Sequence, residues 1–165
     1  MKAAKLTHVG RSGEARMVDV SDKPVTIREA RARGSVKMSA DALKAVVAGN
    51  LPKGEVIATA RIAGIQAAKR TSDLIPMCHP LSLTVIDLEC VADPRLPGIR
   101  IESRVRCEGK TGAEMEALTA VAVAALTVVD MAKSADRWMT IEGVELVEKR
   151  GGKSGDLRRP ASSRS

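Results

Sequence analysis

Aromatic residues are nearly absent from the sequence, which contains one Trp and neither Phe nor Tyr. The core must therefore be built from Val, Ile, Leu, Ala and Met, and it has few large side chains to bury. We expect contacts between subunits to supply part of the missing burial. The same scarcity argues against a site for single-stranded nucleic acid, because such sites usually stack bases on aromatic rings.

Cysteine is also scarce. The chain has three cysteines, an odd number, and no two of them form a CxxC pair. This favours reduced thiols in a cytosolic protein over a disulfide framework. No second Cys or His stands at metal-binding spacing from Cys78, apart from its direct neighbour His79, so we expect no metal site.

Long apolar segments are lacking as well. The N-terminal residues MKAAKLTHVGRSGEAR contain no apolar signal core. The longest apolar stretch, residues 117–129, is interrupted by two threonines and is shorter than the ~20 residues that span a bilayer. We therefore interpret this stretch as a buried helix, and we expect a cytoplasmic protein that does not act on membranes.

Positive charge is what the chain has in excess, with a formal net charge of +7. A basic balance indicates anionic partners, such as phosphorylated metabolites or nucleic acid. No zinc-finger or basic-zipper pattern is present. A basic nucleic-acid-binding module with an α+β fold stays the competing class, and a steep salt dependence of DNA or RNA binding would support it.

The length of 165 residues fits one domain. We place it at residues 17–150, between a mobile N-terminal segment (1–16) and a flexible C-terminal tail (151–165) rich in Gly, Ser, Lys and Arg. Within it, periodicity and turn residues predict strands at 25–38, 82–92, 99–107 and 139–148, and helices at 39–49, 55–74 and 111–135. This order matches the βαββαβ pattern of the ferredoxin-like fold, an α+β antiparallel sheet with helices on one face.

Two local patterns support these assignments. Residues 99–107 alternate strictly between Ile, Val or other small side chains and charged ones, which predicts a half-buried strand of an antiparallel hairpin. Thr111 and Glu114 form a T-x-x-E capping box, which predicts the start of the long helix.

The long helix carries one narrow polar stripe. At about 100° per residue, its polar groups fall on one side of an otherwise apolar helix; they are Glu116, Thr119, Thr127, Asp130 and Lys133. The stripe either faces solvent or forms the wall of a polar pocket, and periodicity does not decide between the two. Asp130 and Lys133, at i and i+3, are either a simple ion pair or a catalytic acid–base pair.

A second candidate segment lies between Pro76 and Pro80. Two prolines restrict the backbone around Met77, Cys78 and His79, which suits a histidine that must point in one direction. A lone histidine is more often structural than catalytic, although its ordinary pKa suits proton transfer near neutral pH. Isolated basic residues form the third component, and together they could hold a polyphosphate; they are Lys53, Lys69, Arg70, Lys149 and Lys153.

Residues 69–81 (KRTSDLIPMCHPL) and 110–133 (KTGAEMEALTAVAVAALTVVDMAK) resemble the MoaC family of cyclic pyranopterin monophosphate synthases, enzymes of molybdenum cofactor biosynthesis. The resemblance is continuous from residue 17 to residue 155 and includes ATARIAGI at 58–65 and GGKSG at 151–155. It implies a lyase that converts 3′,8-cyclo-7,8-dihydroguanosine 5′-triphosphate into cyclic pyranopterin monophosphate with release of pyrophosphate.

The resemblance also implies a ferredoxin-like subunit assembled as a homohexamer, a trimer of dimers, with active sites between subunits. It implies no redox cofactor and leaves open whether Mg²⁺ accompanies the triphosphate. The expected partner is a small cyclic GTP-derived triphosphate, with no role for nucleic acid or membrane.

Carried over by position, the resemblance implies roles for particular residues. Asp130 is the expected catalytic acid–base, and Lys53, Lys133 and His79 are expected to move protons or stabilise phosphate. The remaining positions correspond to substrate contacts, the last five less directly than the others; they are Met77, Cys78, Met115, Glu116, Glu114, Lys69, Arg70, Lys149 and Lys153. The sequence departs from the family pattern at Ala132, where Cys is expected, and at Trp138. A catalytically inactive homologue is the remaining alternative, against which the presence of Asp130, Lys133 and His79 argues.

Overall fold

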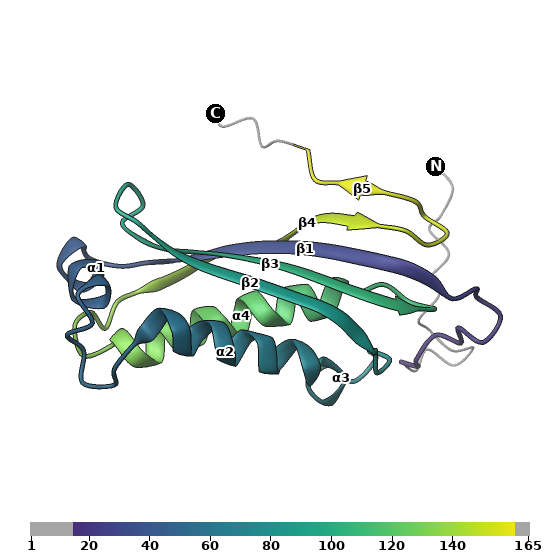
Figure 1. The fold of residues 1–165 in the computed structure, drawn as a ribbon, viewed down its shortest axis with the longest axis horizontal. Helices are drawn as coiled ribbons and strands as arrows, with labels where there is room; N and C mark the ends of the chain where they lie inside the picture. Colours follow the sequence, from purple (N-terminus) through teal and green to yellow (C-terminus); the bar gives the residue numbers. More distant parts are fainter. Residues whose placement is uncertain (1–14, 161–165) are drawn as a thin grey trace.

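The computed structural model describes residues 15–160. Most of the predicted N-terminal segment 1–16 therefore lies outside the described residues. The elements follow the order β1 (Thr26–Lys37), α1 (Ala40–Val47), α2 (Val56–Lys69), α3 (Thr71–Leu74), β2 (Leu83–Asp93), β3 (Gly98–Gly109), α4 (Glu114–Ala132), β4 (Thr140–Arg150) and β5 (Leu157–Arg158). Figure 1 shows the long helices α2 and α4 lying against one face of the sheet.

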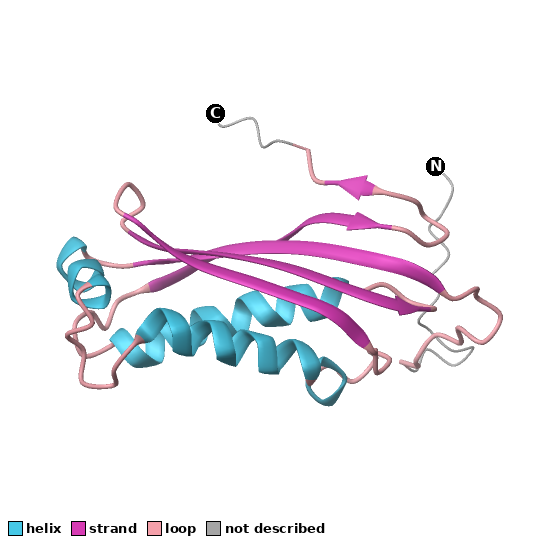
Figure 2. Cartoon of the chain, in the orientation of Figure 1, coloured by secondary structure: helices cyan, strands magenta, loops and turns pink. Residues whose placement is uncertain are grey.

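All neighbouring strands of the sheet are antiparallel, in the order β2-β3-β1-β4-β5. The first four strands have the arrangement of a ferredoxin-like fold, so the predicted α+β class is confirmed. The layering of helices on one side is visible in Figure 2. Strand β5 falls in the segment expected to be a flexible tail. There Arg159 also donates its backbone N–H to the carbonyl of Val147, so the chain is paired to β4 beyond residue 150.

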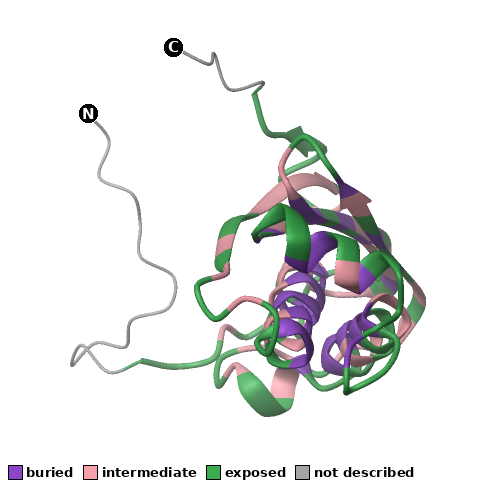
Figure 3. Cartoon of the chain, turned by 90° about the vertical axis from the view of Figure 1, so that its left-hand side faces the viewer, coloured by how far each residue is buried: buried purple, intermediate pink, exposed green. Residues whose placement is uncertain are grey.

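The alternation predicted for residues 99–107 is confirmed. In β3 the inward side chains are all buried against the helices: Ile99, Ile101, Ser103, Val105 and Cys107. In β1 the inward positions Ala30, Ala32 and Val36 are buried in the same way. Figure 3 shows this buried layer between the sheet and the two long helices. The core is aliphatic throughout, as the composition requires.

Small residues let α2 and α4 approach closely, which compensates for the lack of aromatic side chains. A Cβ at Gly64 of α2 would lie 2.7 Å from the carbonyl oxygen of Ala120 and 3.2 Å from the Cβ of Ala124. Only glycine fits there, because interiors are packed to near-crystalline density. The two helices consequently form one stiff layer under the sheet.

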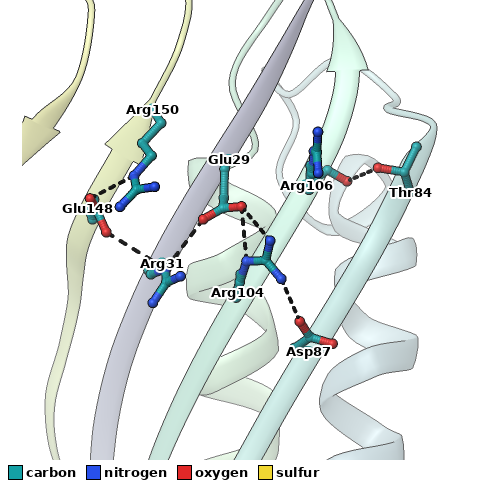
Figure 4. A network of polar contacts seen from close by, with 8 residues as sticks. All are labelled: Glu29, Arg31, Thr84, Asp87, Arg104, Arg106, Glu148 and Arg150. Atoms are coloured by element: carbon teal, nitrogen blue, oxygen red, sulfur yellow. Dashed lines mark hydrogen bonds and ion pairs between the residues drawn. The ribbon is translucent and has the colours of Figure 1, made fainter.

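The other face of the sheet is open and charged. Arg104 pairs with Glu29 and Asp87, and Arg31 lies between Glu29 and Glu148 (Figure 4). The hydrogen bond from Arg104 is the main cause of the lowered pKa of Glu29. Because these arginines are neutralised by carboxylates, this face is not a bare cationic surface.

The helix boundaries confirm one prediction from the sequence and correct three others. Ser39 caps α1 as predicted, with its side chain accepting from the N–H of Ala42. The predicted helix 55–74 is two helices, α2 and α3, separated at Arg70. The predicted capping box is wrong, because Ala113 occupies the N-cap of α4 without a side-chain hydrogen bond. The helix also ends at residue 132, earlier than the predicted 135.

Judged by its length and composition alone, helix α4 could cross a membrane. Its place in the fold explains the composition, because α4 packs against β1, β3, β4 and α2, and most of its residues are buried there. This is the pattern of a core helix in a soluble protein.

Candidate active site

A cluster of three charges lies at the C-terminal end of α4. Asp130 accepts from the ammonium of Lys53 at 2.5 Å and from that of Lys133 at 2.8 Å, one lysine on each carboxylate oxygen. Lys133 follows one helical turn after Asp130, whereas Lys53 comes from the Pro-Lys-Gly turn before α2. All three side chains are about half exposed, so an anion from solvent can reach the two ammonium groups.

The two lysines lower the pKa of Asp130 to about 2, with the hydrogen bond from Lys133 the larger cause and that from Lys53 the next. The carboxylate is therefore ionised at neutral pH in the free protein. In this state it orients both lysines, and it becomes a stronger base only when a ligand draws a lysine away.

A second site lies near the other end of α4, in a pocket of about 520 Å³. Six of the residues predicted to bind substrate line this pocket, three from the Pro76–Pro80 segment and three from the start of α4; they are Met77, Cys78, His79, Glu114, Met115 and Glu116. The structure thus brings together two segments that are more than 30 residues apart in sequence. Periodicity could not have paired them.

Glu116 is the most perturbed group of this pocket. Its side chain is buried, with 4% of the residue exposed, and burial raises its pKa to about 7, with the charge of Glu114 adding to the shift. Burial and the Glu116 charge also raise the pKa of the Cys78 thiol, so this cysteine is not an activated nucleophile. Glu116 can therefore exchange a proton near neutral pH.

Glu114 and Lys149 connect the pocket to the sheet. The ammonium of Lys149 on β4 lies 2.9 Å from the Glu114 carboxylate. The Glu114 side chain folds over Gly112, where a Cβ would collide with it. This ion pair replaces the capping interaction that the sequence had predicted for Glu114.

A third, adjoining pocket of about 750 Å³ contains a cation that the sequence analysis did not identify. Arg28 of β1 is 9% exposed, and its Nε donates to the carbonyl of Gly109 at 2.9 Å. Its guanidinium packs against Gly152, whose φ of 78° places it in the left-handed region. Lys153 lines the same pocket, and Lys23 lines both this pocket and the one that contains His79. The detectable signal was an arginine at an inward position of β1, where the alternation calls for an apolar residue.

The polar stripe of α4 is neither wholly exposed nor wholly enclosed. Glu116 and Thr119 are buried at one end, whereas Asp130 and Lys133 are exposed at the other. Glu116 and Asp130 are fourteen residues apart, which is about 21 Å along an α-helix. Within one chain, the Asp130 cluster and the His79 pocket are therefore two separate places.

Two of the predicted substrate contacts belong neither to the Asp130 cluster nor to the His79 pocket. Lys69 and Arg70 end α2, are exposed, and line none of the pockets described above. Among residues 15–160 no group of three or more His, Cys, Asp or Glu side chains is placed to hold a metal ion.

A ferredoxin-like sheet, with polar pockets near the start of its core helix and an Asp–Lys–Lys cluster at the end of that helix, defines an α+β domain with room for a small polar molecule. The chain belongs to the MoaC family, whose sequence model matches residues 17–152. It is 59% identical over 152 residues to a cyclic pyranopterin monophosphate synthase of Methylobacterium sp. (strain 4-46), covering 92% of this chain and 95% of the relative. It is 55% identical over 159 residues to the protein of the same name from Nostoc sp. (strain PCC 7120 / SAG 25.82 / UTEX 2576), covering 96% and 95%. A third relative of that name, from Cereibacter sphaeroides (strain ATCC 17029 / ATH 2.4.9), is 58% identical over 91% of this chain and 94% of its own length.

Proposed function

We propose that this protein is a cyclic pyranopterin monophosphate synthase, a lyase of molybdenum cofactor biosynthesis. It converts 3′,8-cyclo-7,8-dihydroguanosine 5′-triphosphate into cyclic pyranopterin monophosphate and pyrophosphate. The observation that carries the proposal is that a chain of the MoaC family places the expected site residues in two clusters, the Asp130 cluster and the His79 pocket. We treat these two clusters as half-sites. The Asp130 cluster is suited to bind phosphate, and the His79 pocket is suited to bind a polar ring.

The Asp130 cluster provides the phosphate chemistry. A ribose-derived hydroxyl attacks the α-phosphorus, a new P–O bond forms, and the bond to the pyrophosphate oxygen breaks. The ammonium groups of Lys53 and Lys133 stabilise the charge that develops on the leaving pyrophosphate. As those ammonium groups turn to phosphate, the pKa of Asp130 rises from its low value, and the carboxylate becomes able to accept the hydroxyl proton.

The His79 pocket provides the ring chemistry. Opening and reclosure of the purine-derived rings require protons to be removed and returned, and His79 and Glu116 are the groups of this pocket suited to that exchange. Met77, Cys78 and Met115 line the pocket with apolar surface against which a flat ring can pack. Arg28, Lys149 and Lys153 add positive charge beside the pocket for phosphate oxygens.

The site is complete only when two subunits combine, because one ligand cannot contact two half-sites about 21 Å apart. An antiparallel contact between two α4 helices across a two-fold axis near Val123 would place Glu116 of one subunit beside the partner subunit's Asp130. Exposed Leu126 provides apolar surface on the open side of α4. The acidic beginning of one helix would face the lysines at the end of the other, so the charges are complementary.

Three such dimers form the homohexamer that we propose, in the cytoplasm and without a redox cofactor. The neutralised arginines of the open sheet face support a small-molecule partner over nucleic acid. Mg²⁺ bound to the triphosphate is compatible with the lysine cluster, and chelation with EDTA in the assay tests whether it is needed.

The direct test is to incubate the full-length protein with the cyclic GTP-derived substrate and to measure pyrophosphate and the pterin product. Release of both products is expected. If the folded wild-type protein releases neither, the proposed activity is wrong.

Complementation tests the shared site separately. Asp130→Asn and His79→Ala subunits, each inactive alone, are mixed and allowed to exchange. Mixed dimers carry one intact site each, so about one quarter of the wild-type activity should return. If wild-type protein is active and the mixture stays inactive, the activity stands and the shared site is refuted.

A further inference from the structure

The only aromatic side chain of the protein is also its most exposed large hydrophobic one among the described residues. Trp138 lies in the loop between α4 and β4 with 89% of its surface exposed. An indole in water is costly, because Trp is highly buried on average in folded proteins. Nothing in the reaction described above requires Trp138.

The loop that presents Trp138 is held in place. The Asp136 carboxylate accepts the N–H of Trp138 and the N–H of Ser39, both at 2.8 Å. These two bonds lower the pKa of Asp136, with the Trp138 bond the larger cause. The indole is therefore displayed from a fixed backbone next to the start of α1.

An apolar groove of about 380 Å³ lies on the other side of α1. It runs between that helix and the β2–β3 turn, and its lining is almost entirely aliphatic: Ala40, Leu43, Val47, Ala48, Ala92, Pro94 and Pro97, with Lys44 at the rim. Val47 is 63% exposed there, whereas the neighbouring aliphatic residues Leu43 and Val46 of the same helix are buried.

The loop that carries Trp138, between α4 and β4, and helix α1 lie at the same end of the fold (Figure 1). Two adjacent backbone groups join them: the N–H of Met38 donates to the carbonyl of Pro97 beside the groove, and the N–H of Ser39 donates to Asp136 beside Trp138. A surface that carries both an exposed indole and an apolar groove can pair with a second copy of itself across a two-fold axis, each indole entering the other copy's groove. The same chain cannot fill its own groove with Trp138, because the indole is exposed.

We propose that Trp138 of one subunit inserts into the α1 groove of a second copy of this chain, and that the partner does the same in return. Lys44 at the rim then lies against the indole face, where a cation–π contact adds to the burial. Two reciprocal indoles bury about 300–500 Å². This is less than the ~1,200 Å² of a stable stand-alone interface, so the contact joins subunits that are also held elsewhere.

The single Trp makes the test direct, because all indole fluorescence of this chain comes from Trp138. At a concentration where the protein is oligomeric by sedimentation, we expect emission shifted to the blue and weak quenching by acrylamide, compared with the same protein in guanidinium. Native emission and quenching equal to those of the unfolded chain would overturn the proposal.

Val47→Glu places a charge in the groove without touching a buried side chain. We expect the Trp emission to shift to the red, the acrylamide quenching to rise, and the sedimenting mass to fall. Leu74→Glu is the matched control, because Leu74 is a similarly exposed aliphatic residue on α3, away from the groove; it should leave Trp emission unchanged. Shielded emission in Val47→Glu would show that the indole is buried elsewhere and would refute the groove as its seat.

Trp138→Arg should raise the dissociation constant of the contact roughly 30-fold, which corresponds to a hot spot of about 2 kcal/mol. Trp138→Phe should retain most of the assembly. Equal sedimenting mass for wild type and Trp138→Arg across a dilution series would contradict the inference.

Discussion

Helix α4 carries a buried carboxyl group, Glu116, near its start and a half-exposed one, Asp130, near its end, and the two experience opposite environments. Glu116 is buried beside a second acidic residue, and its pKa rises to about 7. Asp130 is half exposed between two lysines, and its pKa falls to about 2. The comparison shows that desolvation governs one end and ion pairing the other, on the same element and with the same functional group.

In the proposed reaction, this difference gives the two ends of α4 different roles. A carboxyl that titrates near neutrality can give and take protons during ring chemistry, whereas a permanently charged one holds cations until phosphate replaces it. The following variants test this contrast, beginning with the one that should change the protein most.

Replacing Asp130 should nearly abolish turnover while leaving the fold intact. Asp130→Asn releases both lysines and removes the proton acceptor, so we expect pyrophosphate release to slow by roughly 10²–10⁴-fold. Thermal unfolding should change little, because exposed ion pairs contribute little stability. Asp41→Asn, which breaks the equivalent i,i+3 pair with Lys44 on α1, is the matched control and should keep wild-type turnover. Near-normal turnover in Asp130→Asn would remove this residue from the mechanism.

Glu116 should make the protein less stable as the pH rises. Its folded pKa of about 7 lies above its ordinary value of 4.5. Between these two values the folded state retains a proton that the unfolded chain has lost, so the free energy of unfolding falls with rising pH. The loss levels off above about pH 8, one unit past the folded pKa, and amounts to roughly 3 kcal/mol.

Glu116→Gln should remove that loss. Urea unfolding at about pH 5 and about pH 8 measures how the free energy of unfolding changes with pH. The variant should be more stable than wild type at the higher pH. Glu89→Gln, an exposed change on β2, should keep the wild-type dependence. Parallel pH profiles for wild type and Glu116→Gln would show that Glu116 is not desolvated.

A methyl group at residue 64 should loosen both ends of α4 together. Gly64→Ala forces a Cβ against the Ala120 carbonyl and should cost about 1–3 kcal/mol of unfolding free energy. Gly109→Ala is the control, since its nearest neighbour would be at an ordinary 3.6 Å. Chemical denaturation distinguishes them, and equal stabilities would mean that the helices can move apart without cost.

The smallest effect should be confined to the Glu116 end. The buried Ser103 hydroxyl donates to the Ala117 carbonyl at 2.8 Å, joining β3 to the start of α4. Ser103→Ala should cost about 0.5–1.5 kcal/mol, and amide exchange should speed up in the first half of α4 more than in the second. Ser35→Ala removes only a 3.5 Å contact to Glu142 and should be nearly neutral. Uniform acceleration along the helix would argue against a local anchor.

Periodicity was sufficient for the four long strands and for the core, but not for the short strand β5. The alternation of residues 99–107 predicted which side chains of β3 are buried, because a strand has only two faces and one of them is covered. The helix boundary at Arg70 and the cap at Ala113 were not predictable in this way. Tertiary contacts determine both, and in the second case Glu114 pairs with Lys149, far away in sequence.

The sequence could single out candidate site residues, but it could not predict how they are arranged. The sequence identified one stripe on the long helix, and its spacing carried no information on which part the Pro76–Pro80 segment would cover. That segment encloses Glu116 and leaves Asp130 open. Arg28 was missed because a basic residue at the start of a strand is usually exposed, and only its inward phase distinguished it.

The close packing at Gly64 has a consequence for how this protein can vary. Because α4 packs closely against α2 at Gly64, the length of α4 sets both the distance and the angle between the Asp130 cluster and the His79 pocket. One inserted residue would advance everything beyond it by about 1.5 Å and turn it by about 100°. Insertions and deletions should therefore be tolerated in the surface turns but not in α4, because its number of residues sets where the two clusters lie.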